Sequence, residues 1–291
     1  MFQSFALLPI RSAWEHVELP LPIVGVRPGC ERRVEKEGIL RFAYSTINWG
    51  ETCAMAATAA EIRSAGWGAA ELFAHTLDWL GLPDKLLAQL GSLRAATLFA
   101  GIDLPTSSKQ LTIHKNRIDY AAAIGAAAYG VLTGGRLRWR PPTAAEYHEV
   151  ASFCDELAEY GAAQGVAVAY HPHTACTIET EAEIDILMEQ TRTLGLCLDA
   201  SHIALVGEDP VAHMQKYRER LTYVHLKDWG HGKFVELGQG TLGIDFPAIL
   251  RTLDEMNYPG WIVIESSRSD ESPLRSAQIN AEYLTRLGYT L

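Results

Sequence analysis

The chain has 291 residues, of which 48% are hydrophobic and 21% charged, and its 25 basic and 35 acidic side chains give a formal charge of −10 at pH 7. These proportions are typical of a globular protein with a sizeable core and argue against disorder, fibrous repeats and membrane insertion. At roughly 100–200 residues per domain, the length allows two ordinary domains or one large α/β domain. Nucleic-acid binding needs a basic face, so the acidic balance argues against a nucleic-acid partner.

Five widely spaced cysteines, without a C-x-x-C pair, fit neither a disulfide framework nor a zinc knuckle. This usage predicts a reducing, cytoplasmic location. No apolar run approaches the ~20 residues of a transmembrane span, so we expect no membrane partner. The apolar N-terminus lacks a basic start and a clear cleavage site, and we do not interpret it as a signal peptide.

Residues 1–39 differ from the rest of the chain. They carry four prolines and a charged patch over 31–37, with no sustained period of 2 or 3.6 residues. We expect an irregular N-terminal arm or extension here, or the product of a start codon placed too far upstream. A single catalytic domain is expected over residues 40–291.

From residue 40 onward, short apolar runs of strand length alternate with segments of helical spacing. The expected strands are 40–47, 69–74, 95–100, 126–132, 166–170, 194–198, 221–226 and 261–264, and the clearest helices are 54–65, 144–163, 181–190, 210–220, 246–256 and 274–287. Near-continuous apolar strands between helices predict a parallel sheet covered on its outer face. Eight such units in about 250 residues predict a (β/α)8 TIM barrel. A doubly wound sheet is the competing architecture, but no Gly-x-Gly-x-x-Gly follows the first strand.

Helix punctuation supports this architecture. Thr143 has the position of an N-cap, and Glu146 three residues later completes a capping box. We therefore assign Glu146 a structural role and no chemistry.

Polar residues follow four consecutive strands in the second half of the chain. They are His171 and His173, Asp199 and His202, His225 and Lys227, and Glu265. Active sites of TIM barrels lie at these carboxyl ends, and imidazole with carboxylate suits Mn²⁺, Co²⁺, Fe²⁺ or Zn²⁺. Taken singly, an aspartate here also fits a helix N-cap and a histidine a hydrogen-bonded turn residue. Four adjacent strands ending in this way favour a metal site.

The same segments carry a family resemblance. Residues 169–173, 198–202, 224–228 and 260–265 resemble the sugar-phosphate isomerase/epimerase superfamily of xylose-isomerase-like barrels, and are most similar to its myo-inosose dehydratase branch. The resemblance implies one divalent ion, Mn²⁺, Co²⁺ or Zn²⁺, held by Asp199, His225 and Glu265. Many members supply a further glutamate from the fifth strand, where this chain has Ala169. Alternation places His171 on the same inward side, so we expect His171 or His173, or a water, as the fourth ligand.

The alanine at position 169 also bears on the expected reaction. Epimerases and isomerases of this superfamily resemble two-base enzymes, with carboxylates on opposite faces of an enediolate. Without one carboxylate, Glu265 remains as metal ligand and base, with His171, His202 and Lys227 as the candidate acids. Proton removal beside a ketone followed by loss of a β-hydroxyl predicts an inosose-dehydratase-like lyase acting on a keto-sugar or keto-cyclitol.

Four residues are expected to contact the substrate: His173, Lys227, Trp49 and Glu71. Lys227 lies two positions after His225 and so points into the same pocket. Trp49 is a rim aromatic that could pack on a sugar ring. A purely structural role is the alternative for both residues: Lys227 would form a salt bridge, and Trp49 would pack within the rim.

Alternative functions come from different classes. The chain could be a sugar isomerase or epimerase, or a subunit that cleaves C-glycosides or 3-keto-glycosides with a partner chain. An endonuclease IV-like repair enzyme would need more early histidines and a basic groove. A barrel that only binds sugar or a partner subunit would bind no metal. A small polyol or keto-sugar is the expected partner, and both a homo-oligomer and a hetero-subunit partner are open.

Overall fold

The computed structural model describes residues 40–73, 77–135, 140–267 and 270–291, so the expected N-terminal arm lies outside the described residues. The barrel strands are β1 (Arg41–Ser45), β2 (Ala69–Phe73), β3 (Arg94–Ile102), β4 (Ala128–Thr133), β5 (Ala167–Tyr170), β6 (Gly195–Asp199), β7 (Leu221–Leu226) and β10 (Trp261–Ile264). They are parallel and close in the order β1, β10, β7, β6, β5, β4, β3, β2. This confirms the predicted (β/α)8 barrel.

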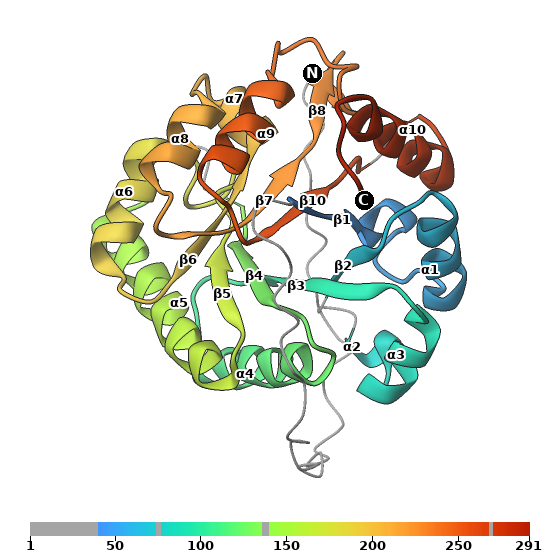
Figure 1. Cartoon of the computed structure of the whole chain (residues 1–291). Helices are drawn as coiled ribbons and strands as arrows, with labels where there is room; N and C mark the ends of the chain where they lie inside the picture. Colours follow the sequence, from blue (N-terminus) through green and yellow to red (C-terminus); the bar gives the residue numbers. More distant parts are fainter. Residues whose placement is uncertain (1–39, 74–76, 136–139, 268–269) are drawn as a thin grey trace.

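Helices surround the strands. The longer ones are α1 (Met55–Ser64), α3 (Pro83–Leu90), α4 (Ser108–Ala123), α5 (Ala144–Gln164), α6 (Glu181–Gln190), α8 (Pro210–Lys216), α9 (Phe246–Glu255) and α10 (Pro273–Arg286). Figure 1 looks along the barrel and shows the strands at the centre with these helices as an outer ring. Three short segments follow β1, β2 and β6: the 3-10 helix η1 (Thr46–Trp49), α2 (Leu77–Leu80) and α7 (Ala200–Leu205).

The predicted capping box begins α5. The Thr143 side chain accepts a hydrogen bond from the Glu146 backbone at 3.3 Å, and the Glu146 carboxylate accepts one from the Thr143 backbone at 2.7 Å. These bonds satisfy backbone donors that the first turn of a helix leaves unpaired. Glu146 therefore has the structural role that its spacing indicated.

The barrel interior is filled by mostly small side chains. This inner core comprises Ala43, Ala69, Ala96, Phe99, Ala128, Ala169, Cys197, Tyr223, Trp261 and Val263. Residues two apart on a strand share a face, so the next inward positions lie nearer the carboxyl ends. These next positions are Ser45, Glu71, His171, Asp199, His225 and Glu265, after Ala43, Ala69, Ala169, Cys197, Tyr223 and Val263. The barrel interior thus has an apolar layer, and a polar layer lies next to it on the side of the strands' carboxyl ends.

A small antiparallel hairpin follows β7 and had no counterpart in the expected elements. It consists of β8 (Asp228–Gly230) and β9 (Lys233–Val235), with Trp229 opposite Phe234. Its turn has positive φ at His231 (53°) and Gly232 (82°), and the usual sequence signal for such a turn is Asn-Gly or Asp-Gly. A histidine at the first position weakens that signal.

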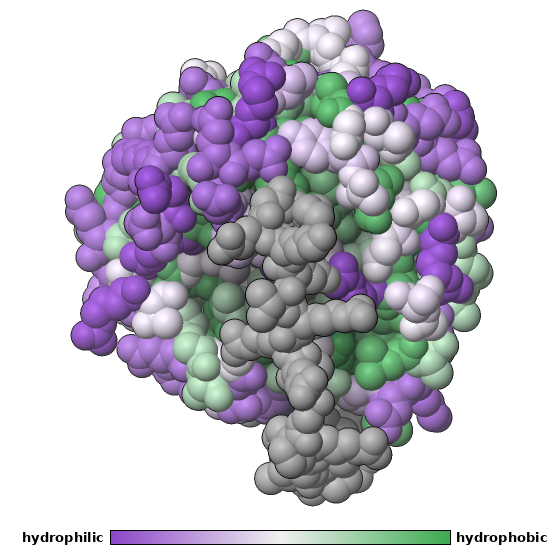
Figure 2. Space-filling view, in the orientation of Figure 1, coloured by the Kyte–Doolittle hydropathy of each residue, from purple (hydrophilic) through white to green (hydrophobic). Residues whose placement is uncertain are grey.

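The outer surface is uneven in character. Seen from the same side, α6 and α8 at the upper left present mainly hydrophilic residues, and apolar residues gather near α2 and α3 at the lower right (Figure 2). Trp79, Leu82 and Leu87 are exposed there.

The four cysteines within the described residues are buried and free. No described helix is both long and apolar enough to span a membrane.

Candidate active site

Asp199 is at the end of β6 and is almost completely buried. Its Oδ1 accepts hydrogen bonds from the backbone amides of Ser201 at 2.8 Å and His202 at 3.3 Å, so it is the N-cap of α7. This bonding holds the carboxylate in one orientation. The second oxygen, Oδ2, is thereby directed away from the helix and toward the strand ends.

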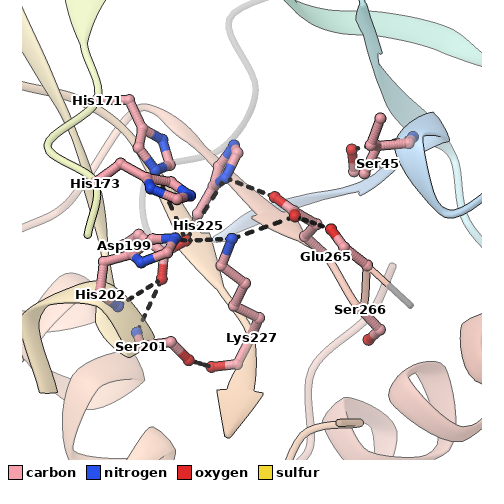
Figure 3. Close-up of polar contacts among 12 residues, drawn as sticks. Ser45, His171, His173, Asp199, Ser201, His202, His225, Lys227, Glu265 and Ser266 are labelled. Atoms are coloured by element: carbon pink, nitrogen blue, oxygen red, sulfur yellow. Dashed lines mark hydrogen bonds and ion pairs between the residues drawn. The ribbon is translucent and has the colours of Figure 1, made fainter. Parts of the chain in front are cut away.

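Three histidines from two strand ends and from α7 surround that oxygen. His171 Nε2, His202 Nε2 and His225 Nδ1 each lie 3.9 Å from Asp199 Oδ2, and Figure 3 shows the imidazole rings grouped on this side of the cluster. The three nitrogens make no hydrogen bond to any described residue. A buried polar atom without a partner costs about 1–3 kcal/mol, and a ligand shared with Asp199 Oδ2 would satisfy all three nitrogens.

Lys227 stands between two carboxylates in the middle of the cluster (Figure 3). Its Nζ is 3.1 Å from Asp199 Oδ2 and 3.2 Å from Glu265 Oε1. Burial alone would lower the pKa of Lys227, but Asp199 and Glu265 outweigh it and raise the pKa above its usual value. The side chain is therefore a buried cation at neutral pH.

Glu265 closes the cluster from the end of β10. Its Oε2 is 3.3 Å from His225 Nδ1, and its Oε1 also accepts a hydrogen bond from the Ser267 hydroxyl. Burial alone would raise the pKa of Glu265, but Lys227 and His225 outweigh it and hold the pKa well below its usual value. Glu265 is thus an ionised carboxylate that can accept a proton or bind a cation.

His171, His173 and His202 are neutral, whereas Cys197 and Glu71 outweigh the effect of burial on His225 and raise its pKa well above the usual value. Burial lowers the pKa of His171 and His202 well below the usual value and that of His173 to about 4. Neutral imidazole is the form that binds metal ions. The rings of His173 and His202 lie with their centroids 3.6 Å apart, and Phe234 of the β8–β9 hairpin packs edge-on against His202.

The donor set fits a divalent ion. His171, Asp199 and His202 offer ligand atoms within 4.8 Å of one another, and so do Glu71, His225 and Glu265. Ligands that bind one ion at ~2.1 Å lie roughly 3–3.5 Å apart, so small side-chain movements would bring the nitrogens around Asp199 Oδ2 into range. Imidazole and carboxylate together are typical of sites for Mn²⁺, Fe²⁺, Co²⁺ or Zn²⁺.

Two of the residues expected to contact the substrate, Trp49 and Glu71, are engaged with other side chains. Trp49 donates a hydrogen bond from Nε1 to Glu61 of α1 at 2.7 Å and packs edge-on against Tyr44. Tyr44 belongs to the core between barrel and helices, so Trp49 does not join the site. Glu71 is completely buried and bonded to neighbouring side chains, which leaves no exposed surface for a substrate.

Several residues that support the cluster were not foreseen. Ser45 is an inward position of β1 and could have been found by strand alternation. Thr97 could not, because the register between β2 and β3 shifts between Ala70 and Glu71 and sets Thr97 opposite Glu71. Phe234 was expected only as an aromatic that could pack on a sugar ring; its ring centroid is 4.5 Å from Lys227 Nζ, and it belongs to the hairpin that the sequence did not signal.

Comparisons with known proteins agree with this fold. A family model described as xylose isomerase-like TIM barrel matches residues 59–287. The chain is 29% identical over 257 residues to an inosose dehydratase of Geobacillus kaustophilus, covering 72% of this chain and 80% of that protein. It is 34% identical over 154 residues to the rhizopine catabolism protein MocC of Rhizobium meliloti, covering 45% and 47%. Apart from the Geobacillus protein, the chain spans about half the length of the first curated relatives it matches.

Solved structures share the architecture at low sequence identity. An L-ribulose 3-epimerase superposes with a TM-score of 0.71 at 18% identity, covering 85% of this chain and 94% of that one. A probable 3-DHS dehydratase from Bacillus anthracis also gives 0.71, at 15% identity, covering 84% and 99%. At these identities the likeness concerns the fold. With a family model that matches most of its length, the chain belongs to the xylose isomerase-like TIM barrel family.

Proposed function

We propose that this chain is a divalent-metal-dependent carbon–oxygen lyase that dehydrates a keto-cyclitol of the inosose type. The observation that carries the proposal is the convergence of three unpartnered histidine nitrogens on Asp199, with Glu265 and the Lys227 cation beside them. A relative that matches 72% of this chain is named inosose dehydratase, which supports the choice of substrate class.

The metal would be held by His171, Asp199, His225 and Glu265. His171, Asp199 and His225 each direct an atom without a hydrogen bond into the same space, and Glu265 Oε2 lies beside His225. When bound, a divalent ion would polarise the substrate carbonyl and stabilise negative charge on the enolate oxygen. His202 Nε2 borders the same space and is available to the ion or to a substrate hydroxyl.

Glu265 and Lys227 supply the two proton transfers. Glu265 is ionised and takes the proton from the carbon next to the carbonyl. Of the three candidate acids, burial keeps His171 and His202 neutral, and Lys227 is the cation. Lys227 therefore protonates the β-hydroxyl, which leaves as water. Because Lys227 Nζ and Glu265 Oε1 are 3.2 Å apart, the proton held by Glu265 can return to Lys227 and reset both groups.

The side chains around the cluster favour elimination over two-base epimerisation. Ala169 contributes only a methyl group to the inner core, so the fifth strand offers no carboxylate at that position. Glu71, on the opposite side of the barrel, has its carboxylate occupied by neighbouring donors. Proton removal by Glu265 alone agrees with loss of a β-hydroxyl from the same intermediate.

The experiment is to incubate the full chain, loaded with Mn²⁺ or Co²⁺, with 2-keto-myo-inositol in D₂O. The proposal expects a diketo product formed with loss of water. Exchange of the carbon-bound hydrogen without dehydration would support the isomerase or epimerase alternative. If neither the diketo product nor the exchange is observed, the proposal is contradicted. The small keto-polyol is the only partner that it requires, and cytoplasmic location and oligomeric state stay predictions.

A further inference from the structure

Glu71 is a buried carboxylate that the proposed chemistry does not use. It lies in β2, in the half of the barrel that carries none of the proposed ligands, and its side chain is 0% exposed. A carboxylate this deeply buried is expected only where other groups satisfy it. The role of Glu71 follows from the groups that bond to its carboxylate.

Three donors converge on the Glu71 carboxylate. The Ser45 hydroxyl donates to Oε1 at 3.1 Å and the Thr97 hydroxyl donates to Oε2 at 3.0 Å. His225 Nε2 lies 2.9 Å from Oε2. The Glu71 carboxylate oxygen is the acceptor of this last contact, as it is for the Thr97 hydroxyl, and His225 Nε2–H is the donor.

That proton has a consequence on the other side of the imidazole ring. In the neutral ring one nitrogen carries the proton and the other a lone pair. With Nε2 donating to Glu71, the nitrogen that can bind an ion in place of a proton is Nδ1, which is 3.3 Å from Glu265 Oε2 and 3.9 Å from Asp199 Oδ2. Nδ1 is thus the nitrogen that faces the proposed metal position. The opposite tautomer would direct an N–H there and could not bind an ion.

His171 is held less firmly and provides an internal comparison. Its Nδ1 is 3.4 Å from Cys197 Sγ, and its Nε2 faces Asp199. A thiol is a weak and neutral partner, whereas a carboxylate bonded to a ligating histidine fixes the tautomer and raises the basicity of the ligating nitrogen. Of the two strand-end histidines, His225 is the one with charged support.

We propose that Glu71 is a positioning residue for the metal site, which acts by fixing the tautomer and ring orientation of His225 so that Nδ1 binds the ion. The inference rests on the proposed function, because it requires that the cluster bind a divalent ion. Ser45 and Thr97 in turn hold the Glu71 carboxylate, so the first three strands support the ligands that the later strands provide.

The test compares Co²⁺ affinity of the full chain with that of Glu71→Gln, followed by the visible absorption of bound Co²⁺. Glutamine keeps the size of the side chain and removes its charge, and we expect the affinity to fall 10–100-fold. Thr97→Val is the matched control, because it removes one donor to Glu71 and leaves the contact with His225. It should lower the melting temperature of the metal-free protein and change the affinity less than about 3-fold.

The outcomes separate this inference from the proposed function. If the wild-type chain binds no divalent ion, both are overturned. If it binds Co²⁺ and Glu71→Gln binds equally well, or if Thr97→Val loses as much affinity as Glu71→Gln, only the role of Glu71 is overturned. If Glu71→Gln does not fold, Glu71→Asp replaces it. The shorter carboxylate withdraws from His225 Nε2, so wild-type affinity in Glu71→Asp would also overturn the inference.

Discussion

The two halves of the barrel contribute different chemistry to the same site. Strands β5, β6, β7 and β10 end in histidines and carboxylates that face a common space, whereas β1, β2 and β3 contribute Ser45, Glu71 and Thr97. The first group is arranged around Asp199, and the second is arranged around Glu71 and is bonded to the first through His225. The half that carries the proposed ligands therefore depends on the other half to hold His225.

The difference between the halves shows how the proposed metal site is distributed in a closed barrel. Closure brings β2 across the interior from β7, so a carboxylate far away in sequence can hold a histidine of the ligand set. A short motif identifies the ligands because their residue types are unusual at strand ends. The supporting residues are ordinary in type, and only their position reveals their role.

The largest effect is expected from Asp199→Asn in the ligand half. Asparagine can still cap α7, so the fold should be retained while the charged oxygen that faces the three histidines is lost. We expect metal affinity to fall by more than the roughly 10–100-fold that loss of a supporting partner produces. Isothermal titration with Co²⁺ measures it, and affinity within 10-fold of wild type would show that Asp199 is not a ligand.

Next in size is Lys227→Met, which removes the cation between Asp199 and Glu265 and keeps the packing of the stem. Loss of the proposed acid should lower kcat by about 10²–10⁴-fold. Removing one partner of a buried ion pair should also destabilise the metal-free protein by about 3–5 kcal/mol. Bound metal should restore part of that stability, because it supplies the missing positive charge.

Steady-state kinetics and melting curves with and without Co²⁺ check both parts of this prediction. Dehydration near the wild-type rate would remove Lys227 from the mechanism. A metal-free variant as stable as the wild type would show that the lysine does not neutralise the two carboxylates.

A smaller effect is expected from Ser45→Ala in the supporting half. The Glu71 carboxylate loses one of its three donors but keeps Thr97 and His225. We expect a loss of about 1 kcal/mol in the free energy of unfolding and a change in Co²⁺ affinity of less than about 3-fold. If Ser45→Ala loses more Co²⁺ affinity than Glu71→Gln, then Ser45, and not Glu71, is the main residue that supports His225.

The smallest effect on the site is expected from His114, a histidine on α4 outside both groups. Burial, reinforced by Arg117, lowers its pKa to about 3, and its Nδ1 is bonded to the Tyr129 hydroxyl at 2.6 Å. In the unfolded chain its pKa is ~6.5, so the unfolded state takes up the proton first. Its contribution to stability is complete above pH ~6.5 and is lost as the pH falls below that value.

His114→Gln retains a partner for Tyr129 and does not titrate. We expect the stability of the wild type to fall by about 2 kcal/mol more than that of the variant between pH 7 and pH 5, with Co²⁺ affinity at pH 7 unchanged. Urea unfolding at the two pH values measures the difference. Parallel losses in the two proteins would contradict the assignment.

Much of this structure was predictable because the sequence repeats one simple pattern. Apolar runs between helical segments predict the barrel, and none of the eight strand ends is displaced by more than two residues. The clustering of Asp199, His225 and Glu265 was predictable because all three lie at the ends of strands whose carboxyl ends meet at one end of the barrel. The role of Glu71 was not, because it depends on a contact across the barrel and on a register shift beside Thr97. Trp49 packs against Tyr44 and not toward the cluster, because a rim aromatic packs outward as readily as inward.

The most direct test of the central claim is anomalous diffraction from crystals of the full chain grown with Co²⁺. The account predicts a single anomalous peak bonded to Asp199, His225 and Glu265, with His171 completing the set and Lys227 moved from between the carboxylates. No peak at these residues, with Lys227 still between Asp199 and Glu265, would contradict a metal site in this barrel.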